Sequence, residues 1–248
     1  SKPGSTSAAP LTMPLLDRDH SILAFNERVL HWATRPRVPL LEHLRFLCIV
    51  SSNLDEFFEV RADPHVAAWR ANDRKGAHSV ASLEALATRT QALVAQQYAI
   101  YNDLLTPALA RQGIRVVPHG ERDAAQRRGV RSYFQREVRP LLVPVGLDPA
   151  HPFPQVANKS LNFIVQLGGR DAFGRDNDIA IVKVPRVLPR MIRLPASVSG
   201  GQALCVSLSS VIRSHLQDLF PGRLVGSFSH FRVTRHSDLS VDEEDVTN

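Results

Sequence analysis

The strongest constraint on the fold is an apolar run, residues 46–50, that leads directly into the polar residues Ser51, Ser52 and Asn53. The apolar run favours burial. The side-chain oxygens of serine and asparagine compete with the backbone for hydrogen bonds, so these residues favour helix starts over helix interiors. We therefore predict that one element ends near Val50 and that a new helix begins at Asn53, beside the core.

The residues that follow fit two overlapping capping boxes, Ser52 with Asp55 and Asn53 with Glu56. A helix that begins here would present free N–H groups and a partial positive charge, which suit an anionic or polar ligand. Two roles stay open for Asn53 on these grounds. One is a simple helix cap, which the spacing alone favours, and the other is a ligand contact.

Helical patterns fill the first part of the chain, and 248 residues are enough for two domains. Residues 1–15 are rich in serine, proline and alanine and have little to bury, so we predict a disordered tail. Four helices with short connections indicate an antiparallel helical domain over residues 16–113. The predicted helices cover about residues 19–33, 39–50, 53–63 and 82–113, with a loop at 72–78, an interruption at Pro107 and an end at Gly113.

Apolar side chains at helical spacing predict the buried faces of the first two helices. Pro64 should end or kink the third helix near Asp63. Cys48 and Cys205 lie in apolar stretches, so we interpret them as buried free thiols in a reducing compartment and not as a disulfide framework. The residues expected to face inward are Ile22, Phe25, Val29, Leu30, Ala33, Leu40, Leu41, Leu44, Leu47 and Cys48.

From residue 114 the pattern changes to short strands and helices, which predicts an α+β domain over residues 114–248. Residues 140–154 contain too many prolines for regular structure. Residues 161–167 and 179–184 form strand-like runs on either side of a glycine-containing polar loop, which indicates a hairpin. The other predicted elements are strands at 114–117, 191–194, 204–206 and 227–234 and helices at about 121–138 and 211–220, before an acidic stub at 242–245.

The formal net charge of +6, carried mostly by arginine, suits a polyanionic partner. Eight arginines lie between Arg111 and Arg139, against three acidic residues. This segment is a candidate polyanion-binding face, but a solvated face opposite an acidic partner domain is the preferred interpretation because arginine surfaces are common. The sequence contains no apolar stretch of membrane-spanning length and no signal-peptide pattern.

The segment Ser-Asn-Leu-Asp-Glu-Phe at residues 52–57 resembles the signature of the type-1 polyphosphate kinases. The resemblance extends in order from about Leu16 to Asp238, which is far more specific than a single motif. It implies a helical N-terminal domain that covers the nucleotide, followed by a truncated head domain that forms the dimer contact. The further matching segments are residues 23–30, 39–47, 158–162, 184–190 and 231–235.

The resemblance implies reversible transfer of the terminal phosphate of ATP to polyphosphate, with Mg²⁺, through a phosphohistidine followed two residues later by lysine. None of the ten histidines here has a lysine at that position, although His43 and His230 are followed by Arg45 and Arg232. No glycine-rich phosphate loop and no metal-ligand spacing occurs either. We therefore expect the catalytic residue and the magnesium ligands to lie outside this chain, and the chain alone to be inactive.

In the family, the asparagine of this signature contacts ATP, and the matching residue is Asn53. With the resemblance counted, we favour the ligand role for Asn53, while Asp55 and Glu56 serve the helix start. Phe57 and Phe58 could stack on a base, but buried aromatic residues are the commoner outcome.

The expected partners are ATP or ADP, polyphosphate and a second copy of the chain through the head domain, with no nucleic acid. We expect a cytoplasmic protein and leave peripheral membrane association open. The alternative is a non-catalytic polyanion-binding or interaction module that reuses these domains.

Overall fold

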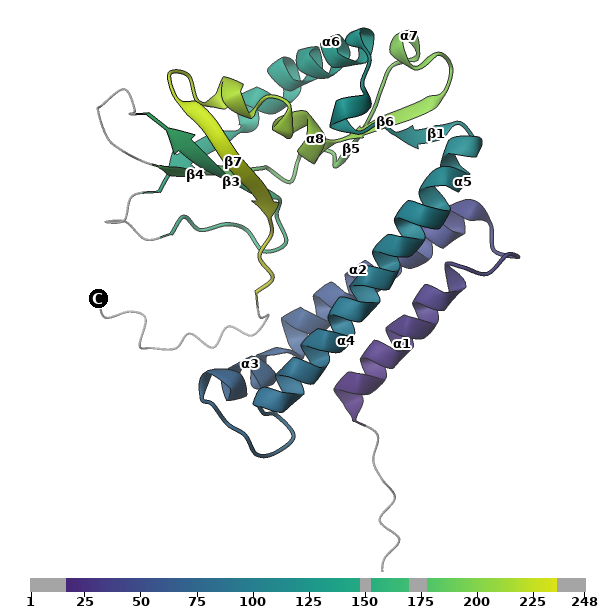
Figure 1. The fold of residues 1–248 in the computed structure, drawn as a ribbon, viewed down its shortest axis with the longest axis vertical. Helices are drawn as coiled ribbons and strands as arrows, with labels where there is room; N and C mark the ends of the chain where they lie inside the picture. Colours follow the sequence, from purple (N-terminus) through teal and green to yellow (C-terminus); the bar gives the residue numbers. More distant parts are fainter. Residues whose placement is uncertain (1–16, 148–152, 170–177, 236–248) are drawn as a thin grey trace, which may run out of the picture. The chain divides into compact units, whose positions relative to one another are not determined.

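The computed structural model describes residues 17–147, 153–169 and 178–235, and it divides the chain into two compact units, Ser1–Tyr98 and Ala99–Asn248 (Figure 1). The predicted tail at residues 1–15 and the acidic stub at 242–245 lie outside the described residues. The predicted boundary after residue 113 stays a prediction. The fold class is confirmed: a helical first part is followed by a mixed α+β part with two small sheets.

Unit 1 is built from the helices α1 (Arg18–Trp32), α2 (Leu40–Val60), α3 (Asp63–Arg70) and α4 (Val80–Ala99). Helix α1 begins where Asp17 caps it by accepting a hydrogen bond from the backbone N–H of His20 at 2.8 Å. In Figure 1, α1, α2 and α4 lie side by side. Two polar contacts agree with that arrangement, since Arg89 of α4 pairs with α1 and Gln97 of α4 donates a hydrogen bond to the carbonyl of Leu47 in α2. The core of this unit includes Leu23, Leu30, Leu47, Val50, Leu54, Phe57, Leu86 and Leu93.

The prediction that one element ends near Val50 and another begins at Asn53 is wrong. Residues 40–60 form one uninterrupted helix, α2, which runs straight through the two serines and Asn53. Apolar residues recur along it at helical spacing, and their burial against neighbouring helices outweighs the preference of serine and asparagine for helix starts. That apolar stripe consists of Leu47, Val50, Leu54 and Phe57.

The predicted buried faces of α1 and α2 are confirmed in part, because Leu30, Ala33 and Leu47 are buried as expected. Phe25 is 51% exposed, Leu41 is 59% exposed, and Cys48 is exposed as well, so none of them packs inward as expected. The buried stripe of α1 runs through Leu23, Asn26 and Leu30, and the asparagine within it is the reason that apolar periodicity found only part of this face. Cys205 is partly buried.

Proline positions mark the helix ends much as predicted. Pro64 lies in the first turn of α3, after a break that ends α2 at Val60, although α3 itself was not predicted. Unit 2 opens with a π-helical segment, Ile100–Leu105, and the short helix α5 (Thr106–Arg111), whose first turn accommodates Pro107. A π-helical turn loosens the backbone ladder that a proline would otherwise disrupt. Gly113 then ends the helix with φ of 74°.

Unit 2 contains two sheets. The first has the order β1-β6-β5 and the second the order β2-β4-β3-β7. The predicted hairpin is confirmed, because β3 and β4 pair antiparallel with Phe163 opposite Val182. The strands predicted near 114, 191, 204 and 227 are also present, whereas the region 140–154 was wrongly predicted to lack regular structure, since it contains β2. The strand bounds are Ile114–Val116 (β1), Val143–Gly146 (β2), Asn162–Gly168 (β3), Ile179–Lys183 (β4), Met191–Arg193 (β5), Ala203–Ser207 (β6) and Leu224–Phe231 (β7).

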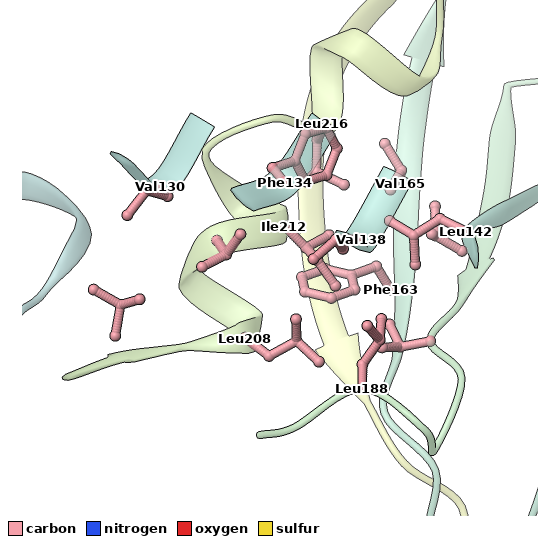
Figure 2. Packing of buried hydrophobic residues seen from close by; sticks show 14 of the residues in the cluster. Val130, Phe134, Val138, Leu142, Phe163, Val165, Leu188, Leu208, Ile212 and Leu216 are labelled. Atoms are coloured by element: carbon pink, nitrogen blue, oxygen red, sulfur yellow. The ribbon is translucent and has the colours of Figure 1, made fainter. Parts of the chain in front are cut away.

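Helices pack on these sheets around one apolar cluster. Helix α6 (Ala124–Tyr133) begins at a capping box between Asp123 and Gln126 and continues as a π-helical segment to Val138. Figure 2 shows Phe134, Phe163 and Ile212 within the cluster, contributed by the π-helical segment, by β3 and by α8. Each such side chain contributes roughly 1.5–3 kcal/mol by leaving water. The remaining helical elements are α7 (Ala196–Ser199), α8 (Leu208–Arg213) and short 3-10 turns at His119–Glu121, Arg139–Leu141 and Leu216–Leu219.

Candidate functional site

Asn53 lies in the interior of α2, and this position removes one of its two predicted roles. Its backbone N–H belongs to the helical ladder, so there is no helix start here to cap and no set of free N–H groups to attract an anion. Asp55 and Glu56 cannot serve a helix start either, because α2 begins at Leu40. Any ligand contact at Asn53 must therefore come from its side-chain amide.

That amide is held by a second asparagine on the neighbouring helix. Asn53 Nδ2 donates a hydrogen bond to Asn26 Oδ1 at 2.8 Å, and Asn26 Nδ2 donates to the carbonyl oxygen of Ile22 at 3.0 Å. The second bond determines which way the Asn26 amide points, because the reverse orientation would place two oxygens against each other. Asn26 in turn determines the orientation of Asn53, whose Nδ2 must face α1.

Burial differs between the two members of this pair. Asn26 is only 1% exposed, whereas Asn53 is half-buried. In the described part of the chain, Asn53 Oδ1 has no hydrogen-bonding partner, and a side-chain amide oxygen can accept two hydrogen bonds. The pair thus presents an oriented acceptor on a surface that solvent reaches.

The aromatic residues beside Asn53 have separate environments. Phe57 is 2% exposed and belongs to the core of unit 1, so it is not accessible for stacking on a base. Phe58 is partly exposed and meets the Phe57 ring edge to face, with 5.4 Å between ring centroids. The expectation that burial is the commoner outcome is confirmed for Phe57.

An ion pair between Glu27, the residue after Asn26 in α1, and Arg89 of α4 holds this part of the helix. Arg89 of α4 donates to both carboxylate oxygens of Glu27, from Nε at 2.6 Å and from Nη2 at 2.9 Å, and also to the carbonyl of His20 at 3.0 Å. The hydrogen bond from Arg89 lowers the pKa of Glu27. A planar two-bond pair of this kind fixes direction as well as distance, so it holds α1 against α4 next to Asn26.

Unit 2 contains a cationic cleft of about 560 Å³ that the sequence did not single out as a site. It lies where the ends of several segments meet, including the turn before β3, the start of β5, the start of α8 and the end of β7. Among the described residues that line it, none is an aspartate or a glutamate. The signal that could have found it is the repeated lysine or arginine in the segments 158–162, 184–190 and 231–235. Its polar lining residues are Lys159, Arg190, Ser207, Ser209, His230 and Arg232.

The arginine-rich segment from Arg111 to Arg139 is not a uniform surface. Arg122 is 3% exposed and donates to Ser214 Oγ at 3.1 Å and to Ser210 Oγ, while its Nε has no partner in the described part of the chain. Burial lowers the pKa of this guanidinium. The other seven arginines of the segment are exposed, and Arg115 pairs with Glu121 at 3.2 Å. Any polyanion face here would exclude Arg122.

Within the described residues, no helix is long and apolar enough to cross a membrane.

Comparisons with known proteins match both units. A family model described as the polyphosphate kinase N-terminal domain matches residues 15–117, and one described as the polyphosphate kinase middle domain matches residues 125–248. A polyphosphate kinase from Neisseria meningitidis serogroup A is 47% identical over 243 residues, covering 94% of this chain and 35% of the relative. One from Burkholderia vietnamiensis is 48% identical over 239 residues, covering 95% of this chain and 35% of the relative.

Among solved structures, the crystal structure of polyphosphate kinase from Porphyromonas gingivalis matches with a TM-score of 0.80 at 30% identity. The match covers 93% of this chain and 34% of that one. The chain thus spans about a third of the length of the relatives that it matches.

Proposed function

The chain belongs to the polyphosphate kinase family, of which it comprises the N-terminal and middle domains, and from this premise we propose what each unit contributes. Unit 1 contributes a contact to the adenine or ribose of ATP through Asn53. Unit 2 contributes a contact between subunits. The transfer of the terminal phosphate of ATP to polyphosphate takes place on residues that this sequence does not contain.

The observation that carries the nucleotide contact is the hydrogen bond between Asn53 and Asn26. It turns the Asn53 amide so that Oδ1 remains available at a partly exposed position. An amide oxygen accepts a hydrogen bond from an exocyclic amine or from a ribose hydroxyl, so the contact suits the adenosine part of ATP. It does not suit the triphosphate, whose oxygens are themselves acceptors.

The division of the reaction follows from the histidines. Phosphoryl transfer through a phosphohistidine needs a nucleophilic imidazole, cationic groups around the phosphates and Mg²⁺. The lysine that follows the family histidine is absent after all ten histidines here. We infer that the histidine, the magnesium ligands and the cationic groups that bind the triphosphate belong to the rest of the enzyme.

The subunit contact is supported by the edges of the four-stranded sheet. Strands β2 and β7 are its outer strands, and each carries an exposed apolar residue, Val143 at 64% and Leu224 at 74%. Exposed strand edges pair readily with another chain. Val143→Lys and Leu224→Lys in the full-length enzyme, compared by sedimentation, tell which edge is used; an unchanged oligomer in both variants would rule out both edges.

A second candidate function is polyanion binding in unit 2, and the cationic cleft favours it. A cleft whose described lining consists of basic groups, serine hydroxyls and apolar side chains attracts phosphate chains and can donate hydrogen bonds to them. Calorimetric titration of the chain with tripolyphosphate should show weaker binding by Arg190→Gln than by Arg128→Gln, an exposed control on α6. Equal affinities of the two variants would exclude the cleft.

The nucleotide contact is tested in the full-length enzyme with Asn53→Ala. The KM for ATP should rise, because one hydrogen bond to the substrate is lost. An unchanged KM for ATP would refute the contact, whatever happens to stability.

A further inference from the structure

Three potential metal ligands from distant parts of the sequence meet at one place in unit 1. Asp19 lies in the first turn of α1, His65 lies in α3, and His78 lies in the segment before α4. One ligand atom from each of the three residues lies within 4.8 Å of the other two. No short motif in the sequence marks this group, because its members are brought together only by the packing of three separate segments.

Two members of the group are buried and the third faces solvent. Asp19 is 6% exposed and His65 is 3% exposed, whereas His78 is exposed. Asp19 Oδ2 and His65 Nε2 are 3.0 Å apart, and the rings of His65 and His78 meet edge to face with 4.6 Å between centroids. A cation bound here would have protein ligands on one side and room for water on the other.

The atoms that do not face the centre of the group are held by neighbouring residues. His65 Nδ1 is hydrogen-bonded to Ser82 Oγ at 2.7 Å, and Asp19 Oδ1 accepts a hydrogen bond from Arg61 Nε at 2.8 Å. Metal-binding histidines usually have the second ring nitrogen hydrogen-bonded in this way, which fixes the tautomer and the direction of the ring. The outer contacts leave His65 Nε2 and Asp19 Oδ2 directed toward the centre.

The environment of Ser82 favours Nδ1 as the protonated nitrogen of His65. The backbone N–H of Ser79 donates to Ser82 Oγ at 2.8 Å, and Ser82 Oγ donates to the carbonyl of Ser79 at 2.8 Å. The hydroxyl proton is thereby used, so Ser82 Oγ acts as an acceptor toward His65. The hydrogen bond to Ser82 Oγ thus fixes the ring so that Nε2 faces Asp19 Oδ2, 3.0 Å away.

We propose that Asp19, His65 and His78 bind one divalent transition-metal ion of the Zn²⁺ class. Two imidazoles and one carboxylate form a ligand set that suits Zn²⁺, Co²⁺ or Ni²⁺, whereas Mg²⁺ prefers oxygen ligands. The site is therefore distinct from the magnesium that phosphoryl transfer requires. The ion links the start of α1, helix α3 and the segment before α4, and its role is structural. The positive charge of Arg61 beside Asp19 moderates its affinity.

Isothermal titration of Zn²⁺ into the chain, freed of metal by a chelator, tests the site. We expect one ion per chain and at least a tenfold loss of affinity in His78→Ala, whose exposed side chain contributes little to folding. Co²⁺ should give the visible absorption of a nitrogen- and oxygen-ligated ion, and His78→Ala should abolish it. Mg²⁺ should show no binding under the same conditions.

Two control variants separate this site from ordinary zinc binding by surface residues. His31→Ala removes an exposed histidine of α1 that lies outside the group, and Cys48→Ser removes the exposed thiol of α2. Both variants should bind Zn²⁺ with the same affinity and stoichiometry as the wild-type chain. Ser82→Ala should weaken binding about tenfold, because the hydrogen bond that orients His65 is lost. Wild-type affinity in His78→Ala, or no binding by the wild-type chain, would show that Asp19 and His65 form only an ion pair.

Discussion

Replacing Asn53 by alanine should have two separable effects, one on stability and one on ATP use. The first follows from the Asn26 side chain, which is almost fully buried and would lose the donor to its Oδ1. A buried acceptor left without a partner costs about 1–3 kcal/mol. Because Asn53 is half-buried, water can enter the space that its side chain leaves, so the lower half of that range is expected.

The second effect is on the nucleotide. One hydrogen bond to a neutral ligand group is worth about 0.5–1.5 kcal/mol, which corresponds to a roughly two- to tenfold rise in the KM for ATP in the full-length enzyme. Stability is measured on the chain by urea unfolding followed by tryptophan fluorescence. Both tryptophans, Trp32 and Trp69, lie in unit 1, so the signal reports the unit that contains Asn53.

The matched control is Asn26→Ala, which breaks the same hydrogen bond from the other side. It leaves the Asn53 amide in place and half-exposed, where water can satisfy it. We expect a comparable loss of stability and a rise in the KM for ATP that is smaller than in Asn53→Ala, because the amide that contacts ATP remains but is no longer oriented by Asn26. If the two variants raise the KM equally, the effect comes from disturbed packing between α1 and α2, and the nucleotide contact is refuted.

Three further outcomes are expected. Incubation of the chain with ATP, Mg²⁺ and a polyphosphate primer should yield neither polymer nor phosphoprotein, and an acid-labile phosphohistidine on it would contradict the division of the reaction. Glu27 has a lowered pKa, so its pairing with Arg89 stabilises unit 1 at pH values above the ordinary 4.5, and this stabilisation is lost as the pH falls through the lowered pKa. The difference in urea midpoint between wild type and Glu27→Gln should therefore be present at pH 7 and disappear as the pH falls below 4.5. A difference that does not depend on pH would refute the contribution of the charge. ATP should bind the chain only weakly in calorimetry at moderate salt, because the groups that bind its phosphates are absent; low-micromolar binding that tripolyphosphate does not compete with would show a complete nucleotide pocket.

Helix α2 shows where sequence reasoning about unit 1 failed. Ser51, Ser52 and Asn53 have the local chemistry of a helix start, and only the packing of the apolar stripe on both sides of them makes the helix continuous. Asn26 caused a different error: it is buried in the core, and apolar periodicity cannot predict a buried polar residue. The signature containing Asn53 was recognised correctly, but its structural meaning was not.

Strands and turns in unit 2 were easier to predict. The hairpin of β3 and β4 follows from two strand-like apolar runs on either side of a glycine-containing polar loop, and Gly113 ends its helix in the left-handed region that only glycine adopts freely. The basic residues of three segments hinted at the cationic cleft, but neither the cleft nor the group at Asp19 could be assembled from the sequence, because each is formed by segments far apart in the chain. Such sites depend on tertiary packing, which local patterns do not contain.

The parallel pairing of β1 with β6 has a consequence for how the protein is made. Ile114 lies opposite Ala203, and the pairing is extended by a hydrogen bond from the Val117 N–H to the Cys205 carbonyl at 2.8 Å. A ribosome therefore releases β1 long before its neighbour exists, and the strand has to wait as an unpaired edge while the rest of unit 2 is synthesised. Because β6 also pairs with β5, its arrival completes both halves of the three-stranded sheet at once. Completion of this sheet is thus a late, cooperative event, and nascent chains stalled before residue 203 are the ones most exposed to aggregation and to proteolysis.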